Sequence, residues 1–284
     1  MQKKALAIHD ISCIGRCSLT VALPILSAAG IETCVLPTAV LSTQTGGMTG
    51  FTFHDLTNEI APITAHWRAL GQRFDIIYTG YLGSITQARL VERVIHDFRK
   101  PDTLVVVDPV MADNGEYYSM MTPEFAEEMR ALCRCADIIT PNLTEAAFLL
   151  GKPYDPCATR ETVEVLLREL VERFGVKKAV ITGISFDKDT LGAAAIDGAT
   201  GAISYAFTEC IRAVFHGTGD IFCSTLICAV AGGKPIAKAI RIAMNFTLRA
   251  IQRTLKAGTD LRLGVQFEPE LPYLIRRLGL MPKL

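Results

Sequence analysis

The sequence has no long hydrophobic run and no excess of either charge. The longest uncharged span, residues 33–53, is interrupted by Pro37, Gln44 and three glycines, so it does not predict a transmembrane helix. Lys and Arg together number 29, as do Asp and Glu. No basic stripe with interleaved aromatic residues occurs. We therefore expect neither a membrane nor a nucleic acid as a partner.

The nine cysteines lack the spacing that is typical of a zinc site. Cys13 and Cys17, like Cys133 and Cys135, do not form C-x-x-C pairs with partner histidines, and we interpret them as core or incidental residues. The apolar stretch that follows Met1 is too short for a signal peptide. Cysteines without an export signal predict free thiols and a cytoplasmic protein.

Two common nucleotide-binding motifs are also absent. Gly232-Gly233-Lys234 is followed by proline and lacks the first glycine of G-x-x-x-x-G-K-[ST]. Gly15 stands alone after the first predicted strand, so there is no G-x-G-x-x-G motif at that point. These absences disfavour a P-loop NTPase and a standard dinucleotide dehydrogenase.

The pattern that is present is an alternation of strands and helices. Half of the 284 residues are hydrophobic, enough for a sizeable core. The predicted strands are 5–9, 33–36, 74–79, 103–107, 137–140, 179–182, 190–196 and 202–207. The predicted helices are 19–29, 57–70 (capped by Thr57), 86–98, 123–132, 142–150, 161–174, 221–228, 236–255 and 270–278. Residues 10–18 and 41–53 are expected to be loops.

This order predicts an α/β fold of three layers, with a mainly parallel central sheet and helices on both faces. The two strands between residues 190 and 207 are expected to form an antiparallel hairpin in the C-terminal half. Residues 1–284 are interpreted as one domain.

A short glycine-rich turn, Gly217-Thr218-Gly219-Asp220, precedes the apolar run 221–228. A glycine turn that leads into a helix can bind an anion, because free N–H groups and the helix dipole point the same way. Asp220 in this first turn has two interpretations. It complements the dipole, or it takes the proton from a hydroxyl that attacks a phosphoryl group.

Polar side chains follow most of the predicted strands, where ligands bind in such sheets. They are His9, Asp10, Ser12, Ser42, Thr43, Gln44, Thr45, Tyr81, Ser84, Asp108, Asp113, Thr140, Asn142, Glu145 and Thr182. Asp108, Asp113 and Glu145 together suit a Mg²⁺ ion that carries nucleotide phosphates.

Some of these residues also have simpler structural explanations. Asn142-x-x-Glu145 fits a helix capping box, and Asp113 begins an ordinary turn. His9 and His216 are more often structural than catalytic.

The motifs together resemble the ribokinase-like superfamily of small-molecule kinases, and within it the pyridoxal (vitamin B6) kinases. The matching segments are Thr79 to Ser84, Val107 to Met111 with Asp113, Ile138 to Glu145, and Gly217 to Asp220. The resemblance spans roughly residues 5 to 256 and implies ATP-dependent phosphorylation of the 5′-hydroxymethyl group of pyridoxal, pyridoxine or pyridoxamine.

The resemblance also implies roles for individual residues. Asp220 is the general base, and the amides of Gly217, Thr218 and Gly219 form an anion hole with it. The expected nucleotide-binding residues are Asp108, Asp113, Thr140, Asn142, Glu145 and Thr182, of which Asp108, Asp113 and Glu145 surround Mg²⁺. The expected substrate-binding residues are Asp10, Ser12, Thr45 and Tyr81. ATP, Mg²⁺, a monovalent cation such as K⁺, and a homodimer follow from the same resemblance.

The sequence departs from the family at one ring contact. Asp10 stands where many members carry serine, so either Ser12 replaces that serine or Asp10 binds the polar edge of the ring as a carboxylate. One alternative is a hydroxymethylpyrimidine kinase, whose members often carry cysteine where this chain has Asp220. A further alternative is a non-catalytic vitamin-binding protein of the same fold, which the presence of Asp220, Glu145 and both glycines disfavours.

Overall fold

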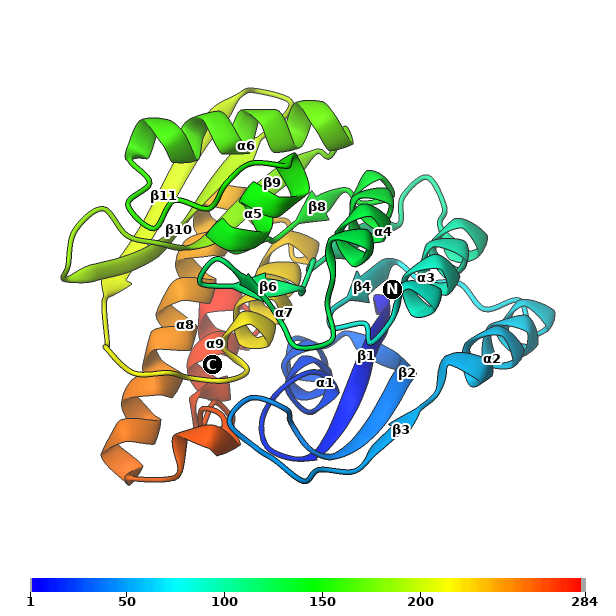
Figure 1. The fold of residues 1–284 in the computed structure, drawn as a ribbon. Coiled ribbons are helices and arrows are strands. Elements are labelled where there is room, and N and C mark those ends of the chain that lie inside the picture. Colours follow the sequence, from blue (N-terminus) through cyan, green and yellow to red (C-terminus); the bar gives the residue numbers. More distant parts are fainter. Residues whose placement is uncertain (1, 282–284) are drawn as a thin grey trace.

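The computed structural model describes residues 2–281, and a nine-stranded sheet runs through it (Figure 1). The strands lie in the order β11 (Ala202–Glu209), β10 (Thr190–Asp197), β9 (Lys178–Ile184), β8 (Ile138–Ile139), β5 (Leu104–Val107), β4 (Ile76–Thr79), β1 (Lys4–Ile14), β2 (Glu32–Thr43) and β3 (Phe53–Asp55). The six strands from β9 to β2 are parallel, and β3, β10 and β11 are antiparallel to their neighbours.

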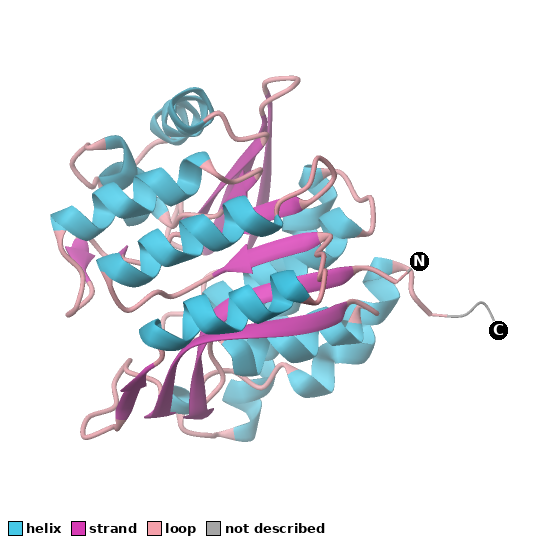
Figure 2. Ribbon diagram, turned by 90° about the vertical axis from the view of Figure 1, so that its right-hand side faces the viewer, coloured by secondary structure: helices cyan, strands magenta, loops and turns pink. Residues whose placement is uncertain are grey.

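Helices cover both faces of this sheet, as Figure 2 shows. One face packs against α1 (Leu19–Ala28), α7 (Thr218–Ala231), α8 (Ile236–Ala257) and α9 (Leu271–Leu278). The other packs against α2 (Thr57–Ala69), α3 (Ile85–Phe98), α4 (Pro123–Arg134), α5 (Leu143–Leu150) and α6 (Arg160–Phe174). Two short 3₁₀ helices, Leu261–Leu263 and Glu268–Glu270, precede α9. The predicted three-layer α/β fold is confirmed.

The strand sequences explain this arrangement. Ala5 and Ala7 of β1 are buried against the α7 side, whereas Leu6 and Ile8 are buried on the opposite side. Successive residues of a strand point to opposite faces, so a strand covered on both sides is apolar throughout. Because the strands from β9 to β2 run in the same direction, their carboxyl ends lie at the same edge of the sheet, and the residues that follow them gather there.

Strands β1 and β2 are longer than predicted, which corrects the expected loop over residues 10–18. β1 continues through Asp10 and Ser12 to Ile14. Its register with β2 shifts between His9 and Ile11, where β2 contains one residue more than β1. Such a shift hides the strand from a periodicity argument.

The expected strand over 33–36 likewise runs on to Thr43, so only residues 44–52 of the expected loop 41–53 lie between β2 and β3. Pro37 is tolerated inside β2 because β3 pairs only with Ala39–Leu41. One side of β2 at Pro37 thus has no strand partner that would need a backbone N–H.

Two further details differ from the expectations. Thr57 is the first residue of α2 rather than its cap, and its backbone N–H donates to the Asp55 carboxylate at 2.6 Å. A second, two-stranded sheet, β6 (Ala112–Asp113) with β7 (Glu116–Tyr117), was not expected from the sequence. The hairpin of β10 and β11 is confirmed.

Within residues 2–281, each helix is too short or too polar to cross a membrane.

Candidate functional site

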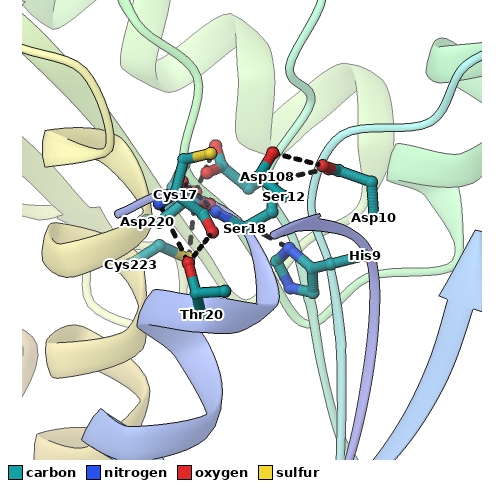
Figure 3. Close-up of polar contacts among 10 residues, drawn as sticks. His9, Asp10, Ser12, Cys17, Ser18, Thr20, Asp108, Asp220 and Cys223 are labelled. Carbon is teal, nitrogen blue, oxygen red and sulfur yellow. Dashed lines mark hydrogen bonds and ion pairs between the residues drawn. The ribbon is translucent and has the colours of Figure 1, made fainter. Parts of the chain in front are cut away.

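The extension of β1 carries Asp10 into the interior at the carboxyl edge of the sheet. Asp10 is 4% exposed, and its two oxygens accept hydrogen bonds from the hydroxyls of Ser12 and Ser18 (Figure 3). Burial raises the pKa of Asp10, while these hydrogen bonds partly offset the rise. Burial and the charge of Asp10 also raise the pKa of the half-buried Tyr81.

The glycine turn before α7 forms as predicted. Gly217 is the N-cap with a φ of 75°, and a Cβ at this position would lie 1.9 Å from the backbone oxygen of Arg16. Only glycine combines that backbone conformation with such a close approach. The turn therefore packs directly on the segment that leads into α1.

Asp220 lies in the first turn of α7 and faces the start of α1. Its Oδ2 accepts the backbone N–H of Ser18 at 2.8 Å, and Ser18 is the N-cap of α1. The side chain is 15% exposed. Burial raises the pKa of Asp220 to about 7, the Ser18 hydrogen bond opposes that rise, and the charge of Asp10 adds to it. A carboxyl with this pKa can exchange a proton near neutral pH.

Asp108 follows β5 and is 7% exposed. The Thr140 hydroxyl donates to its Oδ1 at 3.1 Å, and the same hydroxyl lies 3.4 Å from the sulfur of Cys223 on α7. Burial and the charge of Asp220 raise the pKa of Asp108 to about 8, against the effect of the Thr140 hydrogen bond. The charge of Asp10 on β1 thus affects Asp220 on α7, and the charge of Asp220 affects Asp108 after β5.

Asn142 and Glu145 form the complete capping box of α5. Glu145 is 3% exposed and accepts three backbone N–H groups, from Asn142 at 2.9 Å, Met111 at 3.0 Å and Ala112 at 3.4 Å. The Asn142 amide donates to the Ala112 carbonyl at 2.7 Å. Asn142 and Glu145 therefore connect the start of α5 with the segment after Asp108 through hydrogen bonds. Burial and the Asp108 charge raise the pKa of Glu145, against those hydrogen bonds.

Three predicted site residues lie further out. Asp113 is exposed in β6, and its carboxylate accepts hydrogen bonds from the backbone and side-chain amide of Asn114 at 2.9 and 3.1 Å. Thr182 is half-buried, and its N–H donates to the Pro141 carbonyl at 3.0 Å. Thr45 is exposed in the loop between β2 and β3.

The part of the chain that the structure describes contains no group of three or more His, Cys, Asp or Glu side chains that could hold a metal ion by themselves. The assignment of Asp108, Asp113 and Glu145 to Mg²⁺ stays a prediction, because a metal held mainly by nucleotide phosphates needs only one or two protein carboxylates.

Two residues at the site were not expected from the sequence. Ser18 contacts both Asp10 and Asp220, and Cys223 lies one helical turn after Asp220 beside Thr140. The position of Ser18 directly before a predicted helix was the available signal, because serine is a common N-cap residue. Cys223 looked like any apolar residue of a buried helix.

A family model described as phosphomethylpyrimidine kinase matches residues 23–263. The chain belongs to this family. Members of a kinase family use ATP as the phosphoryl donor, so ATP is a substrate of this protein. The glycine turn beside a buried carboxyl is the kind of site that such chemistry requires.

Individual relatives make the resemblance more specific. A Bacteroides thetaiotaomicron protein assigned as a phosphomethylpyrimidine kinase, in a crystal form with pyridoxal, is 40% identical with a TM-score of 0.93, and the match covers 100% of this chain and 97% of that one. Pyridoxal kinase from Lactobacillus plantarum is 31% identical with a TM-score of 0.89, covering 97% and 98%. The pyridoxine/pyridoxal/pyridoxamine kinase of Bordetella avium strain 197N is 28% identical over 86% of this chain and 83% of that protein. The resemblance to pyridoxal kinases is thereby confirmed.

The close approach of Gly217 to Arg16 predicts that Gly217→Ala lowers the free energy of unfolding by about 1–3 kcal/mol, because alanine is strained at this φ and its Cβ has no space. Thermal or urea unfolding measures the change. Gly219→Ala is the matched control, since no atom of residues 2–281 lies within 4 Å of a Cβ there and alanine favours a helix. Equal destabilisation by the two substitutions would show that the close approach is not a constraint.

Proposed function

We propose that the protein transfers the γ-phosphoryl group of ATP to the 5′-hydroxymethyl group of a B6 vitamer, namely pyridoxal, pyridoxine or pyridoxamine. The observation that carries the proposal is the largely buried Asp220 carboxyl at the N-terminus of α7, in a chain 40% identical to a structure that contains pyridoxal. Salvage of pyridoxal 5′-phosphate is the corresponding role.

Asp220 is the general base in this proposal. One of its oxygens, Oδ2, already accepts the Ser18 N–H, which leaves Oδ1 to take the proton of the substrate hydroxyl. The deprotonated oxygen then attacks the γ-phosphorus, and the bond to the bridging oxygen of ADP breaks. Free N–H groups in the first turn of α7, from Gly217 to Asp220, stabilise the charge on the transferred group.

The vitamer ring is assigned to the region of Asp10, Ser12 and Tyr81, with Thr45 on the loop between β2 and β3. One oxygen of Asp10 accepts a hydrogen bond from the Ser12 hydroxyl and the other accepts one from the Ser18 hydroxyl, so the orientation of its carboxyl group is fixed from two sides. A fixed carboxyl favours a ligand that donates a hydrogen bond from a ring edge. The nucleotide is assigned to Thr140, Asn142 and Thr182.

Mg²⁺ fits the carboxyl of Asp108. This carboxyl is buried with a raised pKa, and a divalent cation beside it would stabilise its charged form. When bound, Mg²⁺ offsets the negative charge of the ATP phosphates. The oxygens of Glu145 accept three backbone N–H groups, so Glu145 would not bind the metal directly but would hold residues 111–112 in place behind it. Asp113 would contact the metal only from the side on which the nucleotide binds.

K⁺ dependence, a homodimer, a cytoplasmic location and one domain over residues 1–284 remain predictions.

The hydroxymethylpyrimidine kinase reaction is the second candidate, because the matching family model carries that description. An ADP-release assay with the three vitamers and hydroxymethylpyrimidine side by side separates the two. We expect a kcat/KM for the best vitamer at least about tenfold above that for hydroxymethylpyrimidine, a difference of 1.4 kcal/mol in transition-state binding. The reverse preference would support the pyrimidine kinase, and no ADP release with any alcohol would support a non-catalytic binding protein.

Asp220→Asn should lower kcat about 100- to 10,000-fold, because the base is lost while the N–H groups of α7 remain. The Kd for ATP should stay within about threefold, because Asp220 has no assigned contact to the nucleotide. Steady-state kinetics and ATP titration measure both quantities. A kcat within a few-fold of the wild-type value would exclude Asp220 as the base.

A further inference from the structure

His9 is a buried histidine whose ring nitrogens have no hydrogen-bond partner within the described chain. The residue is 0% exposed, and neither Nδ1 nor Nε2 is hydrogen-bonded. Burying a polar group without a partner destabilises a fold, so such a group is uncommon and calls for a physical reason. The reactions assigned above to Asp220, Asp108 and Asp10 do not use this imidazole.

The surroundings fix where the imidazole lies. The ring of Tyr78 meets it edge-on, with centroids 4.4 Å apart at 72°. Gly80 lies beside the Nδ1 and Cε1 atoms of the ring, since a Cβ there would be 2.3 Å from Nδ1 and 2.4 Å from Cε1 of His9. The glycine that follows β4 therefore leaves the space that the ring needs.

The unpartnered Nδ1 faces the base. It lies 4.0 Å from Oδ1 of Asp220, the oxygen that the Ser18 N–H does not occupy (Figure 3). This distance is beyond a hydrogen bond, but hydrogen bonds at catalytic groups are often long before substrate binds and shorten in the reacting complex. A carboxylate oxygen has two lone pairs, so Oδ1 can accept one N–H and still take a hydroxyl proton.

We propose that His9 is a positioning residue for Asp220: its Nδ1–H is directed at Oδ1 and, together with the Ser18 N–H on Oδ2, holds the carboxylate plane toward the substrate hydroxyl. The inference rests on the proposed role of Asp220 as the base. Burial lowers the pKa of His9 to about 3, so the imidazole is neutral and carries a single N–H. It therefore orients the carboxylate without adding a positive charge that would weaken the base.

Other titratable groups also interact electrostatically with Asp220, and they contribute to any pH profile of the enzyme. They are Asp10 on β1, Cys17 before α1, Tyr78 on β4, Asp108 after β5, Tyr118 after β7 and Cys223 on α7. None of them changes between the variants compared below, so a difference between those variants reports on residue 9.

The test compares His9→Asn with His9→Leu, two side chains of nearly equal size and shape. The Asn amide places an N–H close to the position of Nδ1, whereas Leu places only a methyl group there. We expect His9→Leu to lower kcat roughly 10- to 100-fold, the loss that a misplaced catalytic group produces, with KM values within about threefold. Removing an N–H that favours the charged carboxylate should also move the acid limb of the kcat profile to higher pH. His9→Asn should keep kcat within about fivefold of the wild type, with an unmoved limb.

A merely structural role gives different results. Leu in an apolar site should then fold as well as His, and kcat should be the same in both variants; equal kcat values with an unmoved acid limb would overturn the proposal. A second comparison uses the Asp220→Asn background, where we expect His9→Leu to cause no further loss of the residual turnover. A further loss as large as in the wild-type background would also overturn it.

Two controls keep these outcomes separate. If His9→Leu does not fold, His9→Gln replaces it, because its amide lies near Nε2 rather than Nδ1; activity equal to that of His9→Asn would then contradict the proposal. Wild-type turnover is measured with both the best B6 vitamer and hydroxymethylpyrimidine. A wild-type enzyme that prefers the pyrimidine refutes the proposed substrate alone, and the His9 variants are then compared on that alcohol.

Discussion

Asp10 and Asp108 are buried and Asp220 is largely buried at the same edge of the sheet, and the chemistry proposed for this protein depends on that burial. The pKa of each carboxyl rises mainly because its charged form loses hydration, and neighbouring charges raise the pKa of Asp108 and Asp220 further. Hydrogen bonds from Ser18, Ser12 and Thr140 oppose these shifts. The balance of these effects leaves the pKa of Asp220 at about 7. A carboxyl with this pKa is partly deprotonated at neutral pH and is basic enough to accept a proton from a hydroxyl group.

The fold imposes this arrangement through three backbone features. Parallel strands bring the end of β1 and the residues after β4, β5 and β8 to one edge, where Asp10 and Ser12 of β1 are buried. The glycine turn at Gly217 lets α7 begin directly against the start of α1, so that one carboxyl meets the N-termini of two helices. The capping box of α5 fixes the segment after Asp108. Function at this site is therefore a consequence of backbone positions as much as of acidic side chains.

The sequence was sufficient for the layers, for most helices and for the residues that end the strands, because apolar periodicity and caps are local signals. It failed at β1 beyond His9 and at β2 around Pro37, where pairing between strands, rather than composition, decides the structure. It predicted Asn142 and Glu145 both as a cap and as site residues, and the cap is confirmed. Ser18 and the unpartnered state of His9 are properties of tertiary packing that no local pattern contains.

Burial raises the pKa of the Asp220 carboxyl to about 7 before any substrate binds. A carboxyl-carbon NMR titration of the free protein tests it directly, with the Asp220 signal identified by its loss in Asp220→Asn. We expect this carboxyl to titrate with a midpoint near pH 7. A midpoint near the ordinary aspartate value of about 4 would contradict it, because burial would then not be what prepares the base.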